Sequence, residues 1–240
     1  MSQHYNFPAY AEKMENIVNR FGGEKIKTYQ GEDISRLWDI KGGGITWSYK
    51  YLYAVPKLEK IVFSVQSYRD KLMTYTTLAW PDDQHALPVY SSFWAESAKG
   101  SYFIVDLYPT ADCICDMPYF EHYLEPLEDF YNRSVEDFPE KPKRDLSWFR
   151  TFSSPFDIRL DLHSSTEDSQ EKLLRLTTDY FEHYHSLWQK DEPRDSAYMH
   201  RLNERKQAIR KIMAERDPGG SMLVSALGDE LAELSLKVLF

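Results

Sequence analysis

Three closely spaced segments constrain the fold of this chain more than any other feature of its sequence. Residues 71–80, 88–95 and 101–107 are rich in β-branched and aromatic side chains, and short polar turns separate them. Their apolar residues do not alternate strictly with polar ones, which indicates that both faces of these strands are covered. The three segments therefore predict a meander in the middle of a sheet, with helices packed on each side.

The flanking segments supply further strands and the covering helices. Additional strands are predicted for residues 34–40, 45–55 and 58–67, so the sheet has about six strands in antiparallel succession. Apolar residues at helical spacing predict helices over residues 9–21, 117–131, 167–189, 196–216 and 228–240. Residues 148–162 fit either a strand or a helix. We expect an α+β fold, a three-layer α/β/α sandwich with a central antiparallel sheet, built from residues 1–240 as a single domain.

The overall charge limits the kinds of partner. The formal net charge is −9, whereas generic nucleic-acid binding requires an excess of Lys and Arg to neutralise phosphates. The first residues contain no apolar signal core, and no apolar run approaches the length of a membrane span. We therefore expect a cytoplasmic protein that binds neither nucleic acid nor membrane.

Composition leaves the nature of a ligand open. Aromatic residues make up 15% of the chain, which suits a pocket for a large flat ligand and equally an aromatic core. Cys113 and Cys115 are the only cysteines, and they cannot form a four-ligand metal site without histidines from elsewhere. Gly42-Gly43-Gly44 lacks the Lys-Ser/Thr of a phosphate loop and predicts a hairpin turn. We expect no metal site.

Six short motifs, each weak alone, occur in one order along the chain. They are Trp80-Pro81, Leu87-Pro88-Val89-Tyr90, Val105-Asp106-Leu107-Tyr108-Pro109, the FSSPFDIR stretch at 152–159, Arg216-Asp217-Pro218, and a closing stretch from Leu227-Gly228-Asp229-Glu230 to Val238-Leu239-Phe240. In this order they resemble the ferredoxin-dependent bilin reductases and their plant relative, red chlorophyll catabolite reductase.

The resemblance implies a site and a chemistry. A bilin, an open-chain tetrapyrrole, would lie between the sheet and the C-terminal helices, with no organic or metal cofactor bound. Electrons would arrive singly from reduced ferredoxin, and the protein would supply protons to a radical intermediate. Such a proton donor needs a pKa matched to its task, which a carboxyl group in an apolar pocket provides.

Two residues take their expected roles from the matching motifs. Asp217 corresponds to the family's aspartate before proline and would be the proton donor. Its alternative role is to open the Asp-Pro turn or to cap a helix. Arg159 corresponds to an arginine that pairs with a bilin propionate, and its alternative is an ion pair with Asp157 or Asp161.

The chain departs from the family pattern where other members carry strand acids. Many bilin reductases have an aspartate where this chain has Ser92 or Phe93, depending on a gap of one residue, and the phycocyanobilin-forming branch has a Glu and a His at the positions of Ser64 and Thr76. These differences argue against the four-electron reaction of that branch. We interpret Thr76 and Ser92 as substrate-binding residues. Glu96 is a replacement acid if its side chain reaches the pocket, and otherwise a solvated residue before the turn.

A ferredoxin is acidic, so its docking requires a local basic surface on this acidic chain. Residues 196–216 carry Arg201, Arg205, Lys206, Arg210 and Lys211 just before Asp217, and Lys141, Lys143 and Arg144 form a second basic group. Either group attracts a negative partner or is ordinary solvated surface.

The sequence thus favours a ferredoxin-dependent reductase of a biliverdin-type bilin. Two alternatives stay open: a reductase of a chlorophyll-derived linear tetrapyrrole, and a bilin-binding or carrier protein without catalytic activity.

Overall fold

The computed structural model describes residues 7–42, 45–69, 71–139 and 147–240. Its centre is an antiparallel sheet with the strand order β1-β5-β6-β7-β8-β9-β10, and β4 pairs with β5 beside this path. The strands are β1 (Glu24–Lys25), β4 (Ile40–Gly42), β5 (Ile45–Val55), β6 (Leu58–Tyr68), β7 (Leu72–Pro81), β8 (Val89–Ser97), β9 (Gly100–Tyr108) and β10 (Ile158–Leu162). The predicted meander is confirmed as β7, β8 and β9.

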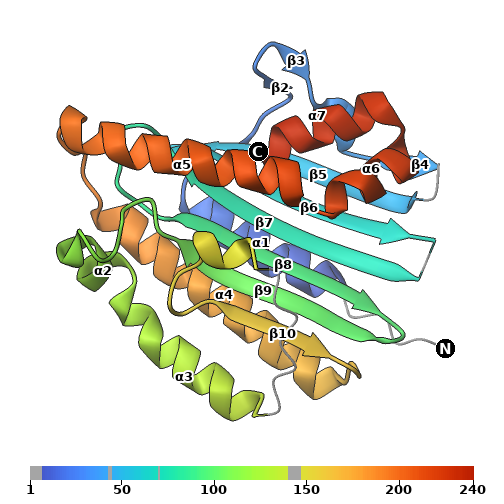
Figure 1. Cartoon of the computed structure of the whole chain (residues 1–240). Coiled ribbons are helices and arrows are strands. Elements are labelled where there is room, and N and C mark those ends of the chain that lie inside the picture. The colour runs from blue at the N-terminus through green and yellow to red at the C-terminus, as the bar shows by residue number, and fades with distance from the viewer. Residues whose placement is uncertain (1–6, 43–44, 70, 140–146) are drawn as a thin grey trace.

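Helices cover both faces of this sheet (Figure 1). One layer contains α1 (Phe7–Arg20), α3 (Glu128–Asp137) and α4 (Glu167–Lys190), and the other contains α5 (Ser196–Arg216), α6 (Gly219–Leu227) and α7 (Asp229–Leu239). The short helix α2 (Met117–Tyr123) lies beside the first layer, and β2 (Thr28–Tyr29) pairs with β3 (Glu32–Asp33) as a separate ribbon. The predicted three-layer α/β/α sandwich is therefore confirmed.

Each face of the sheet has its own hydrophobic core. Toward α1 and α4, rings such as Tyr10, Phe63, Tyr75 and Trp94 are fully buried and pack against one another. Toward α5 and α7, a smaller cluster contains aliphatic residues and Trp80. No helix of the described chain is long and apolar enough to cross a membrane.

Some element boundaries differ from the sequence expectation. Residues 34–40 do not form one strand, because the 3-10 turn η1 (Ser35–Leu37) precedes β4. The helix expected over residues 117–131 is divided by η2 (Glu125–Leu127), which contains the proline that interrupts the helical hydrogen bonds. Residues 148–162 contain the 3-10 turn η3 (Phe149–Thr151) and β10.

The helix α6 was not expected, because Asp217-Pro218-Gly219-Gly220 has the composition of a break. Only Asp217 and Pro218 interrupt the helical structure, and Gly219 already belongs to α6. Pro218 is the N-cap of this helix, and the Gly219 N–H donates to Asp217 Oδ1 at 2.7 Å. The carboxylate thus satisfies a helix N–H that would otherwise have no partner.

Candidate active site on the polar face of the sheet

Strand alternation separates the two faces chemically. Residues i and i+2 of a strand share a face, and the face that contains Leu52, Val62, Leu78 and Tyr108 is covered by α5, α6 and α7. On this face, the strand ends that lie beyond the small core carry hydroxyl, amide and charged side chains. We call it the polar face. The opposite face, toward α1 and α4, is the apolar face.

One cross-strand row runs over the polar face. Successive register partners place the members of this row side by side on β5, β6, β7, β8, β9 and β10; they are Lys50, Ser64, Thr76, Phe93, Ile104 and Arg159. Neighbouring strands are about 4.8 Å apart, so a row of this kind spans roughly 24 Å. It has a basic residue at each end, and its middle contains Ser64, Thr76 and Phe93, three of the positions at which the resemblance would place strand acids.

The register decides which residue occupies the strand-acid position on β8. Phe93 is the register partner of both Thr76 and Ile104 on the polar face, whereas Ser92 points the other way. Burial raises the pKa of the Tyr10 hydroxyl of α1, and Ser92 acts against this effect from the same, apolar face. The interpretation of Ser92 as a substrate-binding residue on the C-terminal side is therefore wrong, because the residue lies one position out of phase. Thr76 does lie on the polar face.

Glu96 is also on the apolar face. Its Oε1 accepts a hydrogen bond from Gln170 Nε2 of α4 at 2.5 Å, and it shares its face with Trp94. Burial raises the pKa of this carboxyl to about 7. Glu96 is thus a perturbed acid, as a replacement donor would be, but the sheet separates it from Asp217. The expectation that it reaches the C-terminal pocket is corrected.

Asp217 lies where α5 ends and α6 begins. Its Oδ1 accepts the Gly219 N–H, so the turn-capping role expected as an alternative is present, while Oδ2 accepts no hydrogen bond from any residue that the structure describes. Burial raises the pKa of the Asp217 carboxyl, although the Gly219 N–H and the charge of Lys50 oppose this effect. Burial raises the pKa of Tyr68 on β6, and the charge of the Asp217 carboxylate raises it further. Asp217 therefore interacts electrostatically with the polar face.

The part of this face beyond Asp217 is open. Thr76, Phe93 and Tyr102 are only half-buried, so this part of the face presents a threonine beside two aromatic residues. A surface groove of about 850 Å³ lies elsewhere, between α5, α6 and α7, and its lining includes Lys211, Val224 and Phe240 but not Asp217. The candidate site is consequently a half-buried sheet surface next to a half-buried acid.

Arg159 is held by its own segment of the chain. Its Nε lies 2.6 Å from Asp157 Oδ2, its terminal nitrogen donates to Ser153 Oγ, and its guanidinium lies 4.9 Å from the centre of the Phe149 ring. The ion pair with Asp157 is thus present in the structure. Five N–H donors belong to a guanidinium, so others are left for a carboxylate ligand.

Asp106 is an acid that the sequence analysis quoted only as part of a motif. It is fully buried on β9, where its Oδ1 and Oδ2 accept hydrogen bonds from Ser154 Oγ at 2.5 Å and Ser154 N at 2.9 Å, and Oδ1 also accepts the Leu107 N–H at 2.7 Å. Burial, and next the charge of Asp157, raise the pKa of Asp106 to about 7. Two motifs of the resemblance, Asp106-Leu107 and Ser153-Ser154-Pro155, are therefore one structural unit that fastens a loop to the polar face.

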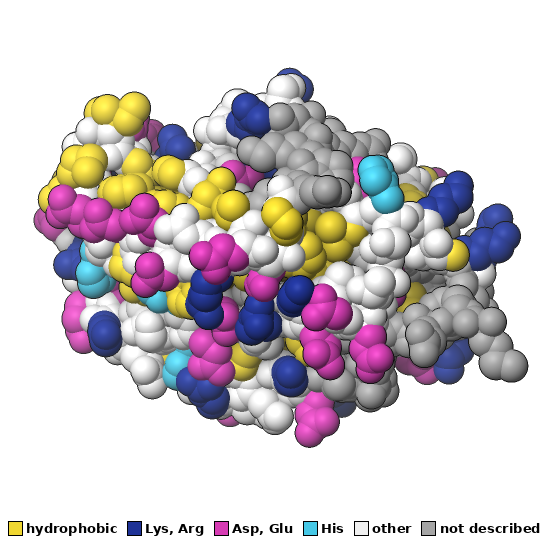
Figure 2. Space-filling view, turned by 90° about the horizontal axis from the view of Figure 1, so that it is seen from below, with side chains coloured by type: hydrophobic (Ala, Val, Ile, Leu, Met, Phe, Trp, Pro, Cys, Tyr) yellow, Lys and Arg dark blue, Asp and Glu magenta, His cyan; other side chains and the backbone are white. Residues whose placement is uncertain are grey.

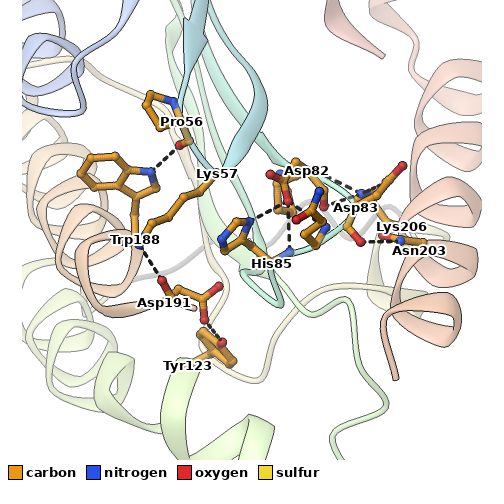
Figure 3. A network of polar contacts seen from close by, with 12 residues as sticks. Pro56, Lys57, Asp82, Asp83, His85, Tyr123, Trp188, Asp191, Asn203 and Lys206 are labelled. Atoms are coloured by element: carbon orange, nitrogen blue, oxygen red, sulfur yellow. Dashed lines mark hydrogen bonds and ion pairs between the residues drawn. The ribbon is translucent and has the colours of Figure 1, made fainter. Parts of the chain in front are cut away.

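Three bases of the surface expected on α5 are engaged in contacts within the protein, and Figure 3 shows this for Lys206. Lys206 is only 1% exposed and donates to the carbonyl oxygens of Pro81 and Asp82 and to Asp83 Oδ1. Arg210 pairs with Glu59 at 2.5 Å, and Arg205 donates to the carbonyl of Pro109 at 3.0 Å.

Of the five α5 bases expected to dock ferredoxin, Arg201 and Lys211 are exposed, and the Lys211 ammonium lies 3.9 Å from Glu215. Lys206 lies on the buried side of α5 with Leu202 and Ile209. The prediction that Lys206 belongs to an exposed basic surface is therefore wrong. The other basic group, Lys141, Lys143 and Arg144, lies outside the described residues.

Two smaller expectations concern aromatic rings and metals. Most buried rings lie in the core of the apolar face, so the aromatic content mainly reflects core packing. Within the described ranges, no three His, Cys, Asp or Glu side chains come together as metal ligands. Cys113 is half-buried and Cys115 is exposed, in the loop before α2.

Comparison with known families decides the relationship of this chain. The family model described as ferredoxin-dependent bilin reductase matches residues 12–240. The chain belongs to this family. Membership identifies it with oxidoreductases whose substrates are bilins and whose electron donor is ferredoxin. No curated protein sequence matches the chain.

Solved structures share the fold of this bilin reductase family member. Phytochromobilin synthase from tomato, solved in complex with biliverdin, superposes with a TM-score of 0.79 at 16% identity, covering 95% of this chain and 80% of that one. A structure of PcyX superposes with a TM-score of 0.53 at 10% identity, covering 97% and 95% of the two chains. At these identities the likeness establishes the fold.

Proposed function

We propose that this chain reduces a biliverdin-type linear tetrapyrrole, bound on the polar face, with electrons from reduced ferredoxin and a proton from Asp217. The observation that carries the proposal is a half-buried carboxyl of raised pKa beside the polar face, in a chain that the family model matches from residue 12 to its last residue. A carboxyl whose pKa is raised holds its proton more readily than an ordinary one and is suited to protonating an electron-rich substrate. The tomato enzyme with the same fold was solved with biliverdin bound.

The proposed reduction of one double bond consumes two electrons and two protons. One reduced ferredoxin transfers one electron to the bound bilin and is oxidised, and Asp217 gives its proton to the resulting radical anion and becomes a carboxylate. A second ferredoxin then supplies the second electron, and a second proton completes the new C–H bonds. This scheme requires no bound organic cofactor or metal.

The middle of the cross-strand row supplies contacts for the pigment rather than acids. Ser64 and Thr76 have hydroxyl groups that can hydrogen-bond polar atoms of the tetrapyrrole, and Phe93 offers a ring for stacking. Arg159 is the proposed propionate anchor through the N–H groups that Asp157 and Ser153 leave unused. Because Asp157 already offsets its charge, we expect this contact to orient the substrate more than to attract it.

Docking of ferredoxin is proposed at the end of the sheet nearest Asp217. The β6–β7 and β8–β9 turns lie at the same end of the sheet as the C-terminus of α5 (Figure 1), and they carry exposed Arg69, Lys71 and Lys99 next to exposed Arg216. None of these four forms an ion pair with a described residue, so their charge is available to an acidic partner. We call them the basic rim.

The face formed by α3 and α4 offers no comparable surface. There acidic and basic side chains are interspersed (Figure 2). Several of its bases form ion pairs, including Arg133 with Asp179 at 3.4 Å and Arg20 with Glu182 at 2.6 Å. Such pairs cancel the long-range field that would guide an acidic carrier.

The test is an anaerobic reaction of purified protein with biliverdin and reduced ferredoxin, followed by absorbance and by chromatography of the extracted pigment. We expect a time-dependent shift to a reduced bilin that requires ferredoxin. Binding of biliverdin without any reduced product would instead favour a carrier, an alternative supported by the absence of ionisable side chains at Ser64, Thr76 and Phe93. Turnover only of a chlorophyll-derived linear tetrapyrrole would replace the substrate and keep the reaction class.

A further inference from the structure

Lys50 is a buried lysine that the proposed reaction has not used. It lies in the middle of β5, is 3% exposed, and directs its ammonium toward α7. Its Nζ contacts the Ser235 hydroxyl and lies 3.3 Å from the Ser235 carbonyl oxygen. Nζ forms no ion pair with a described carboxylate. An ammonium buried with only neutral partners costs several kcal/mol, at roughly the scale known for isolated buried charges, so its position calls for a compensating role.

The position of Lys50 connects it to the candidate site in two ways. First, it is the register partner of Ser64 and so belongs to the cross-strand row on the polar face. Second, α7, whose Ser235 contacts the ammonium, also packs against α6. Gly220 of α6 lies next to Leu236 of α7, since a Cβ added at Gly220 would be 3.9 Å from the Leu236 side chain. Lys50 and Asp217 are therefore on opposite sides of one small packing unit formed by α6 and α7.

The charges of Lys50 and Asp217 act on each other across this unit. Lys50 lowers the pKa of Asp217 against the larger effect of burial. Burial lowers the pKa of Lys50 itself to about 7, the nearby Lys60 lowers it further, and Asp217 acts in the opposite direction. The remaining titratable neighbours are Tyr68, which faces Asp217 from β6, and Glu59, which faces Lys60.

We propose that Lys50 is a positioning residue that stabilises the Asp217 carboxylate left after proton donation and thereby sets when this acid holds its proton. The inference rests on the proposed function of Asp217. When Asp217 transfers its proton to the reduced bilin, its O–H bond breaks and a negative charge forms on Asp217, which the Lys50 ammonium attracts across α6 and α7. Where Lys50 is protonated, its charge favours the carboxylate; without that cation the acid holds its proton more tightly and donates it less readily.

The experiment follows the Asp217 carboxyl directly in ligand-free protein by infrared difference spectroscopy as a function of pH. The Asp217→Asn variant identifies the carboxyl band by its disappearance. In Lys50→Met, we expect the titration midpoint of that band to rise by about one pH unit. This is the order of magnitude of the pKa shift that a single nearby charge causes at an effective dielectric constant near 20. In Lys50→Arg, whose charge persists at all accessible pH, the midpoint stays at or below that of the wild type.

Lys60→Met is the matched control. Lys60 is also a buried lysine, on β6, but its ammonium contacts the Tyr29 hydroxyl and the Lys237 carbonyl, and the charges that act on it are those of Glu59 and Arg210 rather than Asp217. Its loss removes a like charge from Lys50, so the Asp217 midpoint is expected to stay constant or to fall. An unchanged midpoint in Lys50→Met, or an equal rise in both variants, would overturn the proposal. If Lys50→Met does not fold, Ser235→Ala removes the hydroxyl partner of the ammonium but keeps the Ser235 carbonyl, and it is expected to raise the midpoint less; no rise there would count equally against the proposal.

Turnover gives a separate readout. If the bilin reaction is observed, the alkaline limb of its pH–rate profile is expected to move to higher pH in Lys50→Met, because Asp217 stays protonated to higher pH. If no bilin is reduced by the wild type, the proposed function fails, while the infrared titration still decides whether Lys50 controls Asp217.

Discussion

The two faces of the sheet divide stability from chemistry. On the apolar face, aromatic rings pack closely: the ring centres of Tyr10 and Tyr75 are 4.9 Å apart, and those of Tyr75 and Trp94 are 5.3 Å apart. On the polar face, the same strands carry Ser64, Thr76 and Lys50, with a small core limited to one end. The difference teaches that a strand with aromatic residues at alternate positions can serve a core and a ligand surface at once.

The largest expected effect concerns the acid beside the polar face. Asp217→Asn keeps the size of the side chain and an oxygen that can accept the Gly219 N–H, but it removes the transferable proton. We expect bilin binding to be retained and the reduction rate to fall by about 10²–10⁴-fold, the usual contribution of a positioned general acid. Stopped-flow absorbance with reduced ferredoxin measures the rate. We expect a bilin radical to accumulate as an intermediate and to be visible in the absorbance spectrum.

Glu96→Gln is the control for this experiment, because Glu96 is also a carboxyl with a raised pKa, but on the apolar face. Its turnover is expected to stay within about two-fold of the wild type, as for a group that gives no proton in the reaction. A comparable loss in both variants would remove the functional distinction between the faces.

Adjacent residues of β6 compare the faces by stability. Phe63 is buried in the aromatic core and Ser64 follows it on the polar face. Phe63→Ala is expected to lower the free energy of unfolding by about 3–5 kcal/mol, since it opens a cavity in the core. Ser64→Ala is expected to change it by less than about 1 kcal/mol, as it removes one hydroxyl. Denaturant unfolding measures both, and similar losses would contradict the division.

Asp106 fastens a loop to the polar face, and its effect on stability is expected to be intermediate. Asp106→Asn replaces a carboxylate oxygen by an NH₂ group opposite the Ser154 N–H, so we expect a loss of about 1–3 kcal/mol at low pH from an unsatisfied buried donor. Because the folded-state pKa of Asp106 is raised to about 7, the wild-type group stabilises the fold fully below its unfolded pKa, and this contribution is lost as pH rises toward 7.

The measurement is the difference in free energy of unfolding between wild type and Asp106→Asn from pH 4 to pH 7.5. The sign of the linkage requires the difference to shrink as pH rises through this window. A difference that is constant or grows with pH would mean that the carboxyl is ionised throughout and that burial does not control its charge.

The layers and the meander could be predicted because they depend on local composition. Residues 71–107 contain β-branched and aromatic runs between turn residues, and these patterns do not require knowledge of distant contacts. Asp217 could be selected from its motif, and the structure describes it as a half-buried acid that also caps α6. Register was harder: Ser92 and Phe93 differ by one position, and a one-residue shift moves a side chain to the other face.

Other features depend on long-range contacts that composition does not encode. Lys206 reads as part of a basic helix surface, yet its ammonium is buried against the carbonyl groups that end β7, 125 positions earlier in the chain. Asp106 and Ser154 belong to separate motifs, and only their pairing across 48 positions explains both. Lys50 gave no sequence signal, because an isolated lysine in a strand is typical of an exposed edge.

The smallest expected effect tests whether the open end of the polar face is also where electrons enter. Lys99→Glu reverses one charge of the basic rim, and we expect the KM for ferredoxin to rise about two- to five-fold at low salt, with kcat little changed, because a rim charge contributes at most about 1 kcal/mol. Lys190→Glu, at the exposed C-terminal end of α4, is a control of equal charge change at the opposite end of the sheet (Figure 1). The KM values of the two variants should converge as added salt screens the charges.

Equal effects of both reversals at low salt would show that net charge alone governs the encounter, and the basic rim would then have no special role. Reduction of the bound bilin by a small chemical reductant is expected to be the same in both variants, which separates loss of docking from damage to the site.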